Sequence, residues 1–178
     1  EFNLDSARFT KEFAKFGLIK IWVMSNTNKS KLGAITALID GPNINWQDVL
    51  AEVVTTFDCT TGTLHFLERD TNLLILQAQL GIPPFLIPKV SKIPIGKGMA
   101  GIAAERRKPV EMCNLQTDDS GVARPAAKET KVEGSLAAPM MLNGEVYGTL
   151  GIAKPVSYDF TKEEIDDILY IGEKISKK

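Results

Sequence analysis

The dipeptide Asn143-Gly144 lies between two apolar runs, SLAAPMML at 135–142 and EVYGTLGIA at 145–153. A two-residue type I′ turn needs a positive φ angle at both central positions, and Asn-Gly adopts that conformation more readily than most pairs. The pattern therefore predicts a β-hairpin, which commits this part of the chain to antiparallel pairing.

A second hairpin is predicted earlier in the chain. The runs GTLHFLER (62–69) and LLILQAQLG (73–81) flank the short turn at 70–72. Shorter elements are predicted between the two hairpins: an irregular proline-rich segment at 82–88, a brief extended piece within 88–95, a helix at 98–107, an extended piece at 109–113, a loop at 114–121 and a short helix at 123–131.

Three further segments carry apolar residues at helical spacing. One is 4–16, which a polar linker at 25–33 separates from the rest, and another begins at Trp46 after Asn45, a residue type suited to the N-cap. The last begins after Thr161, which forms a capping-box pattern with Glu164. Its apolar stripe consists of Ile165, Ile168, Leu169, Ile171 and Ile175.

These elements together predict an α+β fold. Two hairpins give one antiparallel sheet, and the terminal helices must cover one of its faces, since that face would otherwise be exposed. Loops and short helices are then left for the other face. We expect residues 1–38 to be a helical extension with a linker, and residues 39–178 to be the folded domain.

Three glycines, Gly96, Gly98 and Gly101, have the G-x-G-x-x-G spacing of dinucleotide-binding proteins. That motif works after a strand and at the start of a long helix in a parallel βαβ unit. Here the preceding segment contains a proline, the helix ends before Pro109, and hairpins surround the motif. We therefore interpret the glycines as a tight turn into a short helix, with Gly98 in an unusual conformation and Gly101 allowing close packing on the sheet.

Composition excludes several functions. The net charge is −1 in 178 residues, which gives no reason to expect a nucleic-acid or membrane surface. One histidine, His65, and two separated cysteines do not suffice for an ordinary closed zinc site, and two cysteines make no disulfide framework. We expect a cytoplasmic protein without metal or cofactor, and His65 as a packed or half-exposed strand residue.

Several segments resemble the GAF domain family over about residues 40–178. The stretch IPIGKGMAGIAAERRKPVEM is similar to the family's central motif, and GSLAAPMMLNGEVYGTLGIAKP to its late hairpin. YDFTKEEIDDILYIGEKI is similar to its closing helix, and residues 45–83 to its opening helix and first hairpin. The resemblance implies a sheet of about six strands, a GAF/PAS-like architecture, and a ligand pocket on one face.

The resemblance also implies a non-catalytic regulatory domain of a signal-transduction protein. Such a domain binds a small molecule, mediates dimerisation, or does both, and controls an output domain that this sequence does not contain. The apolar stripes of the terminal helices suit a parallel homodimer, although the same stripes could instead be buried under the sheet.

Two alternatives follow from the same resemblance. Reductases of free methionine sulfoxide use this fold with reactive cysteines near the pocket, and Cys113 would be the candidate nucleophile. Cyclic-nucleotide-binding members carry an Asn-Lys, Phe, Asp-Glu signature. Here Lys154, Phe160 and Glu164 match that signature, while Ala153 and Glu163 depart from it.

The predicted ligand site lies between the sheet and the loops on the face that the terminal helices leave uncovered. Its expected apolar walls are Phe66, Leu76, Met99 and Ala100, together with Ala137 of the late strand. Its expected polar residues are Gln77, Asp118, Ser120, Arg124, Thr130 and Ser135.

Overall fold

The computed structural model describes residues 31–117, 119, 121 and 129–178. The helix predicted at 4–16, most of the linker at 25–33 and most of the helix at 123–131 lie outside these residues. The chain divides into residues 1–34 and residues 35–178, and the description below concerns the second unit. The domain boundary predicted between residues 38 and 39 stays a prediction.

The second unit is built on a six-stranded sheet with the order β3-β2-β1-β6-β5-β4, and every pairing is antiparallel. The α+β fold and the antiparallel sheet are thus confirmed. The strands are β1 (Thr61–Glu68), β2 (Leu73–Leu80), β3 (Lys92–Pro94), β4 (Val110–Met112), β5 (Ser135–Leu142) and β6 (Glu145–Ala153).

Both predicted hairpins are present as β1–β2 and β5–β6. Asn143 has a φ of 51° and Gly144 a φ of 80°. Two positive φ values are what a type I′ turn requires, so the turn prediction is confirmed.

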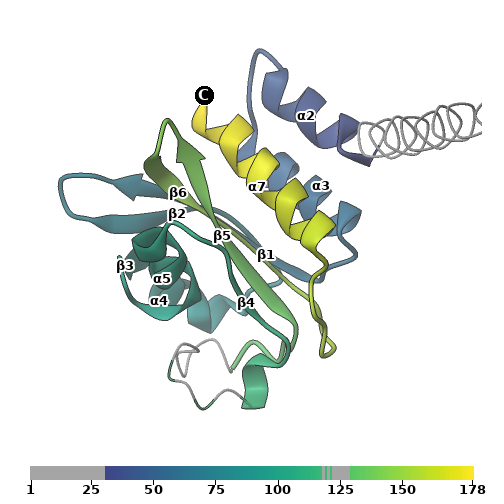
Figure 1. Ribbon diagram of the computed structural model, residues 1–178, viewed down its shortest axis with the longest axis vertical. Coiled ribbons are helices and arrows are strands. Elements are labelled where there is room, and N and C mark those ends of the chain that lie inside the picture. The colour runs from purple at the N-terminus through teal and green to yellow at the C-terminus, as the bar shows by residue number, and fades with distance from the viewer. Residues whose placement is uncertain (1–30, 118, 120, 122–128) are drawn as a thin grey trace, which may run out of the picture. The chain divides into compact units, whose positions relative to one another are not determined.

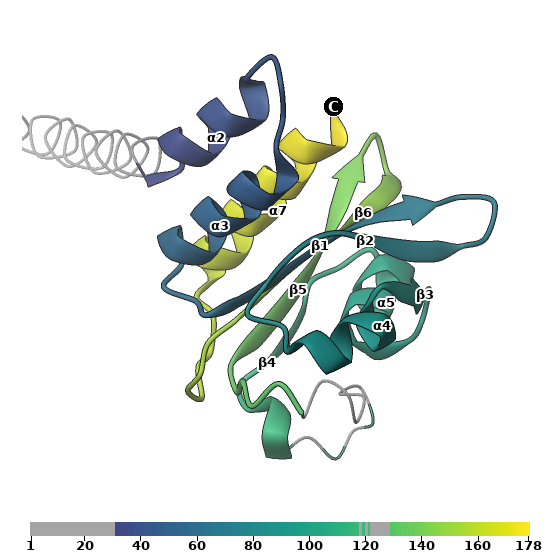
Figure 2. The same cartoon turned by 180° about the vertical axis from the view of Figure 1, so that it is seen from behind.

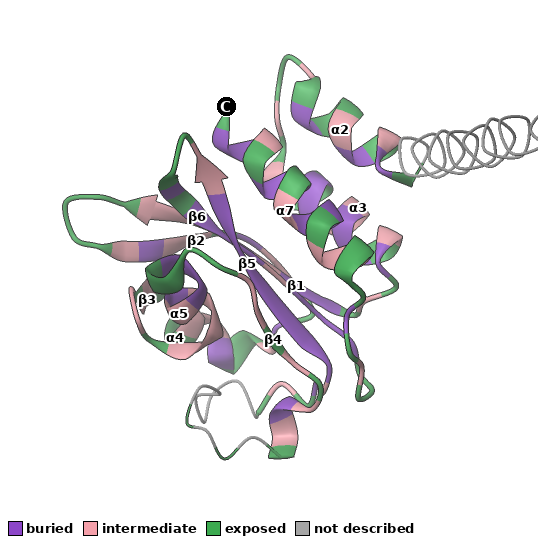
Figure 3. Ribbon diagram, viewed as in Figure 1, coloured by how far each residue is buried: buried purple, intermediate pink, exposed green. Residues whose placement is uncertain are grey.

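Two helices cover one face of the sheet (Figures 1 and 2). Helix α3 (Trp46–Thr56) packs on β1 and β2, and α7 (Lys162–Ser176) packs on β5 and β6. Their predicted caps are present: the Asn45 side chain accepts a hydrogen bond from the Gln47 N–H at 3.0 Å, and Thr161 and Glu164 form the capping box. The strands beneath these helices are largely buried (Figure 3).

Helix α2 (Gly33–Asp40) ends beside the C-terminal end of α7. The carboxylate of Asp40 accepts from Lys174 Nζ at 2.7 Å and lies 3.2 Å from Lys178 Nζ. The hydrogen bond from Lys174 is the largest cause that lowers the pKa of Asp40, and the hydrogen bond from Lys178 adds to it. These two contacts hold the end of α2 against the C-terminal end of the chain.

Short elements occupy the other face of the sheet. They are α4 (Ile87–Val90), α5 (Gly98–Arg106) and two 3-10 turns at Pro84–Leu86 and Leu115–Thr117. The prediction that 82–88 is irregular was wrong, because Pro84 and Pro88 lie in first-turn positions, where a missing N–H leaves no helical hydrogen bond unmade.

The glycine motif forms the turn between β3 and α5. Gly98 has a φ of +62°, and a Cβ at Gly101 would lie 2.3 Å from the carbonyl oxygen of Pro94 in β3. Gly96 N–H donates to the Gly101 carbonyl at 2.8 Å, which closes the turn. These glycines therefore allow a helix to approach a strand of the sheet closely, as the sequence predicted.

We predict that Gly101→Ala lowers the free energy of unfolding by about 1–3 kcal/mol, since the new methyl group meets backbone that cannot move aside easily. Helix propensity alone would give a gain of about 1 kcal/mol for the same change. Urea denaturation measures the difference. Gly41→Ala is the control, because its Cβ would meet only ordinary contacts of 3.5–3.6 Å. A Gly101→Ala protein that is as stable as the control would contradict the packing role.

Candidate functional site

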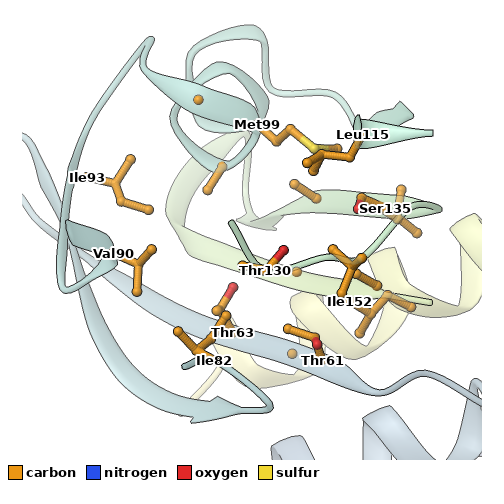
Figure 4. A pocket seen from close by; sticks show the side chains of 18 of the residues that line it. Thr61, Thr63, Ile82, Val90, Ile93, Met99, Leu115, Thr130, Ser135 and Ile152 are labelled. Carbon is orange, nitrogen blue, oxygen red and sulfur yellow. The ribbon is translucent and has the colours of Figure 1, made fainter. Parts of the chain in front are cut away.

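A cavity of about 440 Å³ lies on the sheet face opposite α3 and α7. Its floor is formed by β1, β5 and β6, and its walls by α4, β3, the start of α5 and residues around 115 and 130 (Figure 4).

The floor is hollow because its side chains are small. Two rows of paired residues cross the three strands: Thr61, Ala153 and Ser135 form one row, and Thr63, Gly151 and Ala137 form the other. Successive strand residues point to opposite faces, so the neighbouring row of Leu64, Leu150 and Ala138 faces the helices instead. Small residues on one face and leucines on the other thus determine where the core is solid and where a cavity remains.

The opposite wall is aliphatic. Ile82 and Val90 approach from the segment before β3, Ile93 from β3 itself, and Met99 from the first turn of α5 (Figure 4). Of the described residues that line the cavity, the charged ones are Lys89, Lys97 and Glu129, and all three are exposed. Lys89 and Glu129 form an ion pair of 3.1 Å at the mouth of the cavity.

His65 fixes α4 to the floor. Its Nε2 lies 2.9 Å from the carbonyl oxygen of Val90, which can only accept, so Nε2 carries a proton and donates it to this oxygen. The side chain is 1% exposed, which confirms a packed strand histidine. Burial lowers the pKa of His65, and the hydrogen bond to Val90 offsets part of that effect.

Several of the predicted site residues meet at this cavity. Met99, Ala100, Thr130, Ser135 and Ala137 line it, whereas Cys113 does not. Asp118, Ser120 and Arg124 lie outside the described residues.

Three predicted residues from the first hairpin are not part of the lining. Phe66 lies on the helix face, where its ring meets that of Trp46 at 5.2 Å. Leu76 pairs with His65 in the sheet but does not line the cavity, and Gln77 is exposed. The lining residues of β1 that sequence reasoning missed are Thr61, Gly62, Thr63 and His65, of which Thr61, Thr63 and His65 alternate along the strand.

Neither cysteine has the surroundings of a reactive thiol. Burial raises the pKa of Cys59 to about 11, and its Sγ donates to the Phe57 carbonyl at 3.5 Å. Desolvation and the neighbouring Asp159 carboxylate raise the pKa of the Cys113 thiol. A low thiolate fraction makes a poor nucleophile at neutral pH.

Lys154 of the partial cyclic-nucleotide signature has a structural role in this chain. The side chain is buried, and its Nζ donates to the carbonyl oxygens of Phe57 at 2.6 Å and Asp58 at 3.0 Å, at the end of α3. The same ammonium group lies 4.6 Å from the centre of the Tyr158 ring. These contacts join the end of α3 to the loop that precedes α7.

Two features concern metals and membranes. Within the described part of the chain, no three His, Cys, Asp or Glu side chains gather closely enough to hold a metal ion. Among the same residues, no helix combines the length and the apolar character that crossing a membrane requires.

Comparison with protein families gives a match to the family model described as GAF domain over residues 46–175. Among solved structures, the chain is similar to the GAF domain of a phosphoenolpyruvate-protein phosphotransferase from Coxiella burnetii, with 21% identity and a TM-score of 0.73 over 84% of this chain and 90% of that one. The corresponding domain from Acinetobacter gives 18% identity and a TM-score of 0.71 over 85% and 92%. None of the curated proteins compared with the chain matches it.

The chain is also similar to a free methionine-R-sulfoxide reductase from Neisseria meningitidis, whose structure contains its substrate. The identity is 15% and the TM-score 0.68, over 84% of this chain and 86% of that one. Identities this low establish the fold and leave the activity open, because one fold hosts different functions.

We predict that the free energy of unfolding decreases as the pH falls from 7 to 5. The unfolded chain takes up a proton on His65 near pH 6.5, whereas burial delays that protonation in the folded state, so acid favours unfolding. Urea denaturation at several pH values measures the slope. Because His65 is the single histidine of the sequence, His65→Gln should flatten it. A slope that is unchanged in the variant would show that His65 is not the responsible group.

Proposed function

Because this chain belongs to the GAF domain family, we propose that it is a non-catalytic sensory domain of a signal-transduction protein. In this proposal it binds a small molecule in the cavity and controls an output domain elsewhere in the full-length protein. The cavity between the small-residue floor and the aliphatic wall is the observation that carries the proposal.

The cavity has the character of a small-molecule site. Its volume of about 440 Å³ falls in the range of such pockets, which are mostly apolar with a few placed polar groups. Its floor belongs to β1, β5 and β6, and part of its wall to α4 and the segment around Glu129. The His65–Val90 hydrogen bond joins α4 to β1, and the Lys89–Glu129 ion pair joins α4 to that segment. A ligand that contacts both sides could therefore change how the wall is held.

The reductase alternative has weaker support. It requires a thiolate at the substrate, but Cys59 and Cys113 do not line the cavity, and the pKa of each thiol is raised. The cyclic-nucleotide alternative also has weaker support. Lys154, one of the residues that match its signature, donates its hydrogen bonds to backbone carbonyls at the end of α3.

The proposal includes a homodimer formed through the terminal helices. Ile168 and Ile175 are buried within the single chain, so the stripe of α7 is mainly covered by the sheet. The outer face of α7 is different: Tyr170 is 46% exposed and lies with Leu169 beside the end of β5, in a second groove. We propose that this face of α7 forms part of the dimer contact.

We predict that a thermal-shift screen of small molecules, with neutral amides and alcohols beside amino acids, oxo-acids and cyclic nucleotides, finds a ligand that raises the melting temperature, because a ligand that binds only the folded state stabilises it. Met99→Trp should abolish the shift by filling the cavity, and Cys113→Ser should leave it unchanged. A shift that survives Met99→Trp would locate the ligand elsewhere. Turnover of free methionine sulfoxide that disappears in Cys113→Ser would replace the sensory proposal with the reductase.

We also predict a reversible monomer–dimer equilibrium in sedimentation velocity of the 178-residue chain. Tyr170→Glu should shift it toward monomer, since it places a charge in the proposed contact. Tyr147→Glu is the matched control, because Tyr147 is an exposed tyrosine on β6, away from the terminal helices. A monomer at every concentration would count against the dimer.

A further inference from the structure

The polar groups inside the cavity are neutral hydroxyls. Thr61 and Thr63 alternate along β1 and share its cavity face, Ser135 adds a hydroxyl from β5 on the same floor, and Thr130 also lines the cavity (Figure 4). A hydroxyl group both donates and accepts a hydrogen bond and carries no charge. The inference below rests on the proposed function of the cavity and concerns which ligand it takes.

Thr61 and Thr63 are available for a ligand. Thr61 is 8% exposed and Thr63 is half-buried, and neither hydroxyl has a hydrogen-bond partner among the described residues. A bound molecule that offers a hydrogen-bonding group to β1 can pair with them, so these two residues mark the polar end of the site.

The charged groups lie at the mouth and not in the interior. Lys89 and Glu129 neutralise each other, with side chains that are 53% and 42% exposed, and Lys97 is exposed at the start of α5. His65 is held as a neutral ring that donates to Val90. An ion bound at the floor would lose hydration among neutral side chains, away from the exposed charges of Lys89, Lys97 and Glu129, which is unfavourable.

The wall sets the shape of the remaining part of the ligand. Ile82, Val90, Ile93 and Met99 present branched or flexible aliphatic surface. Apart from the imidazole of His65, no aromatic ring belongs to the described lining. A flat heterocycle would therefore have no aromatic side chain to stack on here, whereas a compact aliphatic group would pack against aliphatic side chains.

We propose that the cavity binds a neutral aliphatic molecule that carries a hydrogen-bonding group, such as a hydroxyl or an amide. The polar group contacts Thr61 and Thr63 on the floor, and the aliphatic body packs on Ile93, Met99 and Val90. The proposal separates this site from one built for free amino acids, oxo-acids or nucleotides, all of which carry charge.

Three probes of the same aliphatic shape test the charge preference: 4-methylpentanamide, 4-methylpentanoate and 4-methylpentylamine at pH 7. Their dissociation constants are measured by NMR titration. We expect the amide to bind at least about tenfold more tightly than either ion, because the ions must be desolvated at the floor. Met99→Trp should weaken the binding of the amide, which locates it in the cavity.

Conservative variants test the hydroxyls. Thr63→Val and Thr61→Val keep the shape of the side chain and should each weaken the amide by about threefold to tenfold, the usual effect of one neutral hydrogen bond. Thr149→Val is the matched control: Thr149 is 1% exposed, its hydroxyl has no partner, and it lies in the same sheet without lining the cavity. It should leave the affinity for the amide unchanged.

The outcomes separate the two proposals. Tight binding of the carboxylate or the ammonium probe that Met99→Trp abolishes would overturn the neutral-ligand inference and leave the cavity as the ligand site. Equal affinity of the amide for the wild type and both threonine variants would overturn the assignment of the two hydroxyls. Failure of the amide to bind would contradict this inference alone, because the proposed function is tested separately by the thermal-shift screen with Met99→Trp.

Discussion

A single antiparallel sheet that must be covered on both faces governs this structure. The helices α3 and α7 cover one face with long apolar stripes, and the leucines of the central strands, including Leu64 and Leu150, face them as a solid core. The other face is covered by short helices and loops that are too small to repeat this packing. On that face Ala104 of α5 packs with Leu74 and Val146 in a smaller core. The floor residues beside this core are small, and the cavity lies over them.

The covering of the cavity face is held by contacts of different kinds. Gly101 brings α5 against the carbonyl of Pro94, His65 binds the carbonyl of Val90, and Lys89 pairs with Glu129. The first contact depends on the absence of a Cβ, the second on a neutral imidazole, and the third on two exposed charges that salt screens. These three contacts hold the short elements of the cavity face in place by unlike means.

Local signals made most of the fold predictable. The Asn143-Gly144 turn, the Asn45 cap and the Thr161–Glu164 capping box each depend on residues close together in sequence, and all three are confirmed. The face of β1 was harder to predict, because both faces of this strand are covered and its apolar residues do not alternate. An irregular pairing near Gln77 in β2 further hides the register, so Phe66 and Leu76 were expected where Thr61 and Thr63 lie.

The methionines provide the most direct test of the cavity as the ligand site. Met99 lines the cavity, Met141 lines the groove beside α7, and Met140 lies in the core on the helix face. With ¹³C-methyl methionine labelling, addition of a ligand should shift the Met99 signal strongly and leave the Met141 signal in place. A shift at Met141 with Met99 unmoved would contradict the account, because it would place the ligand on the outer face of α7.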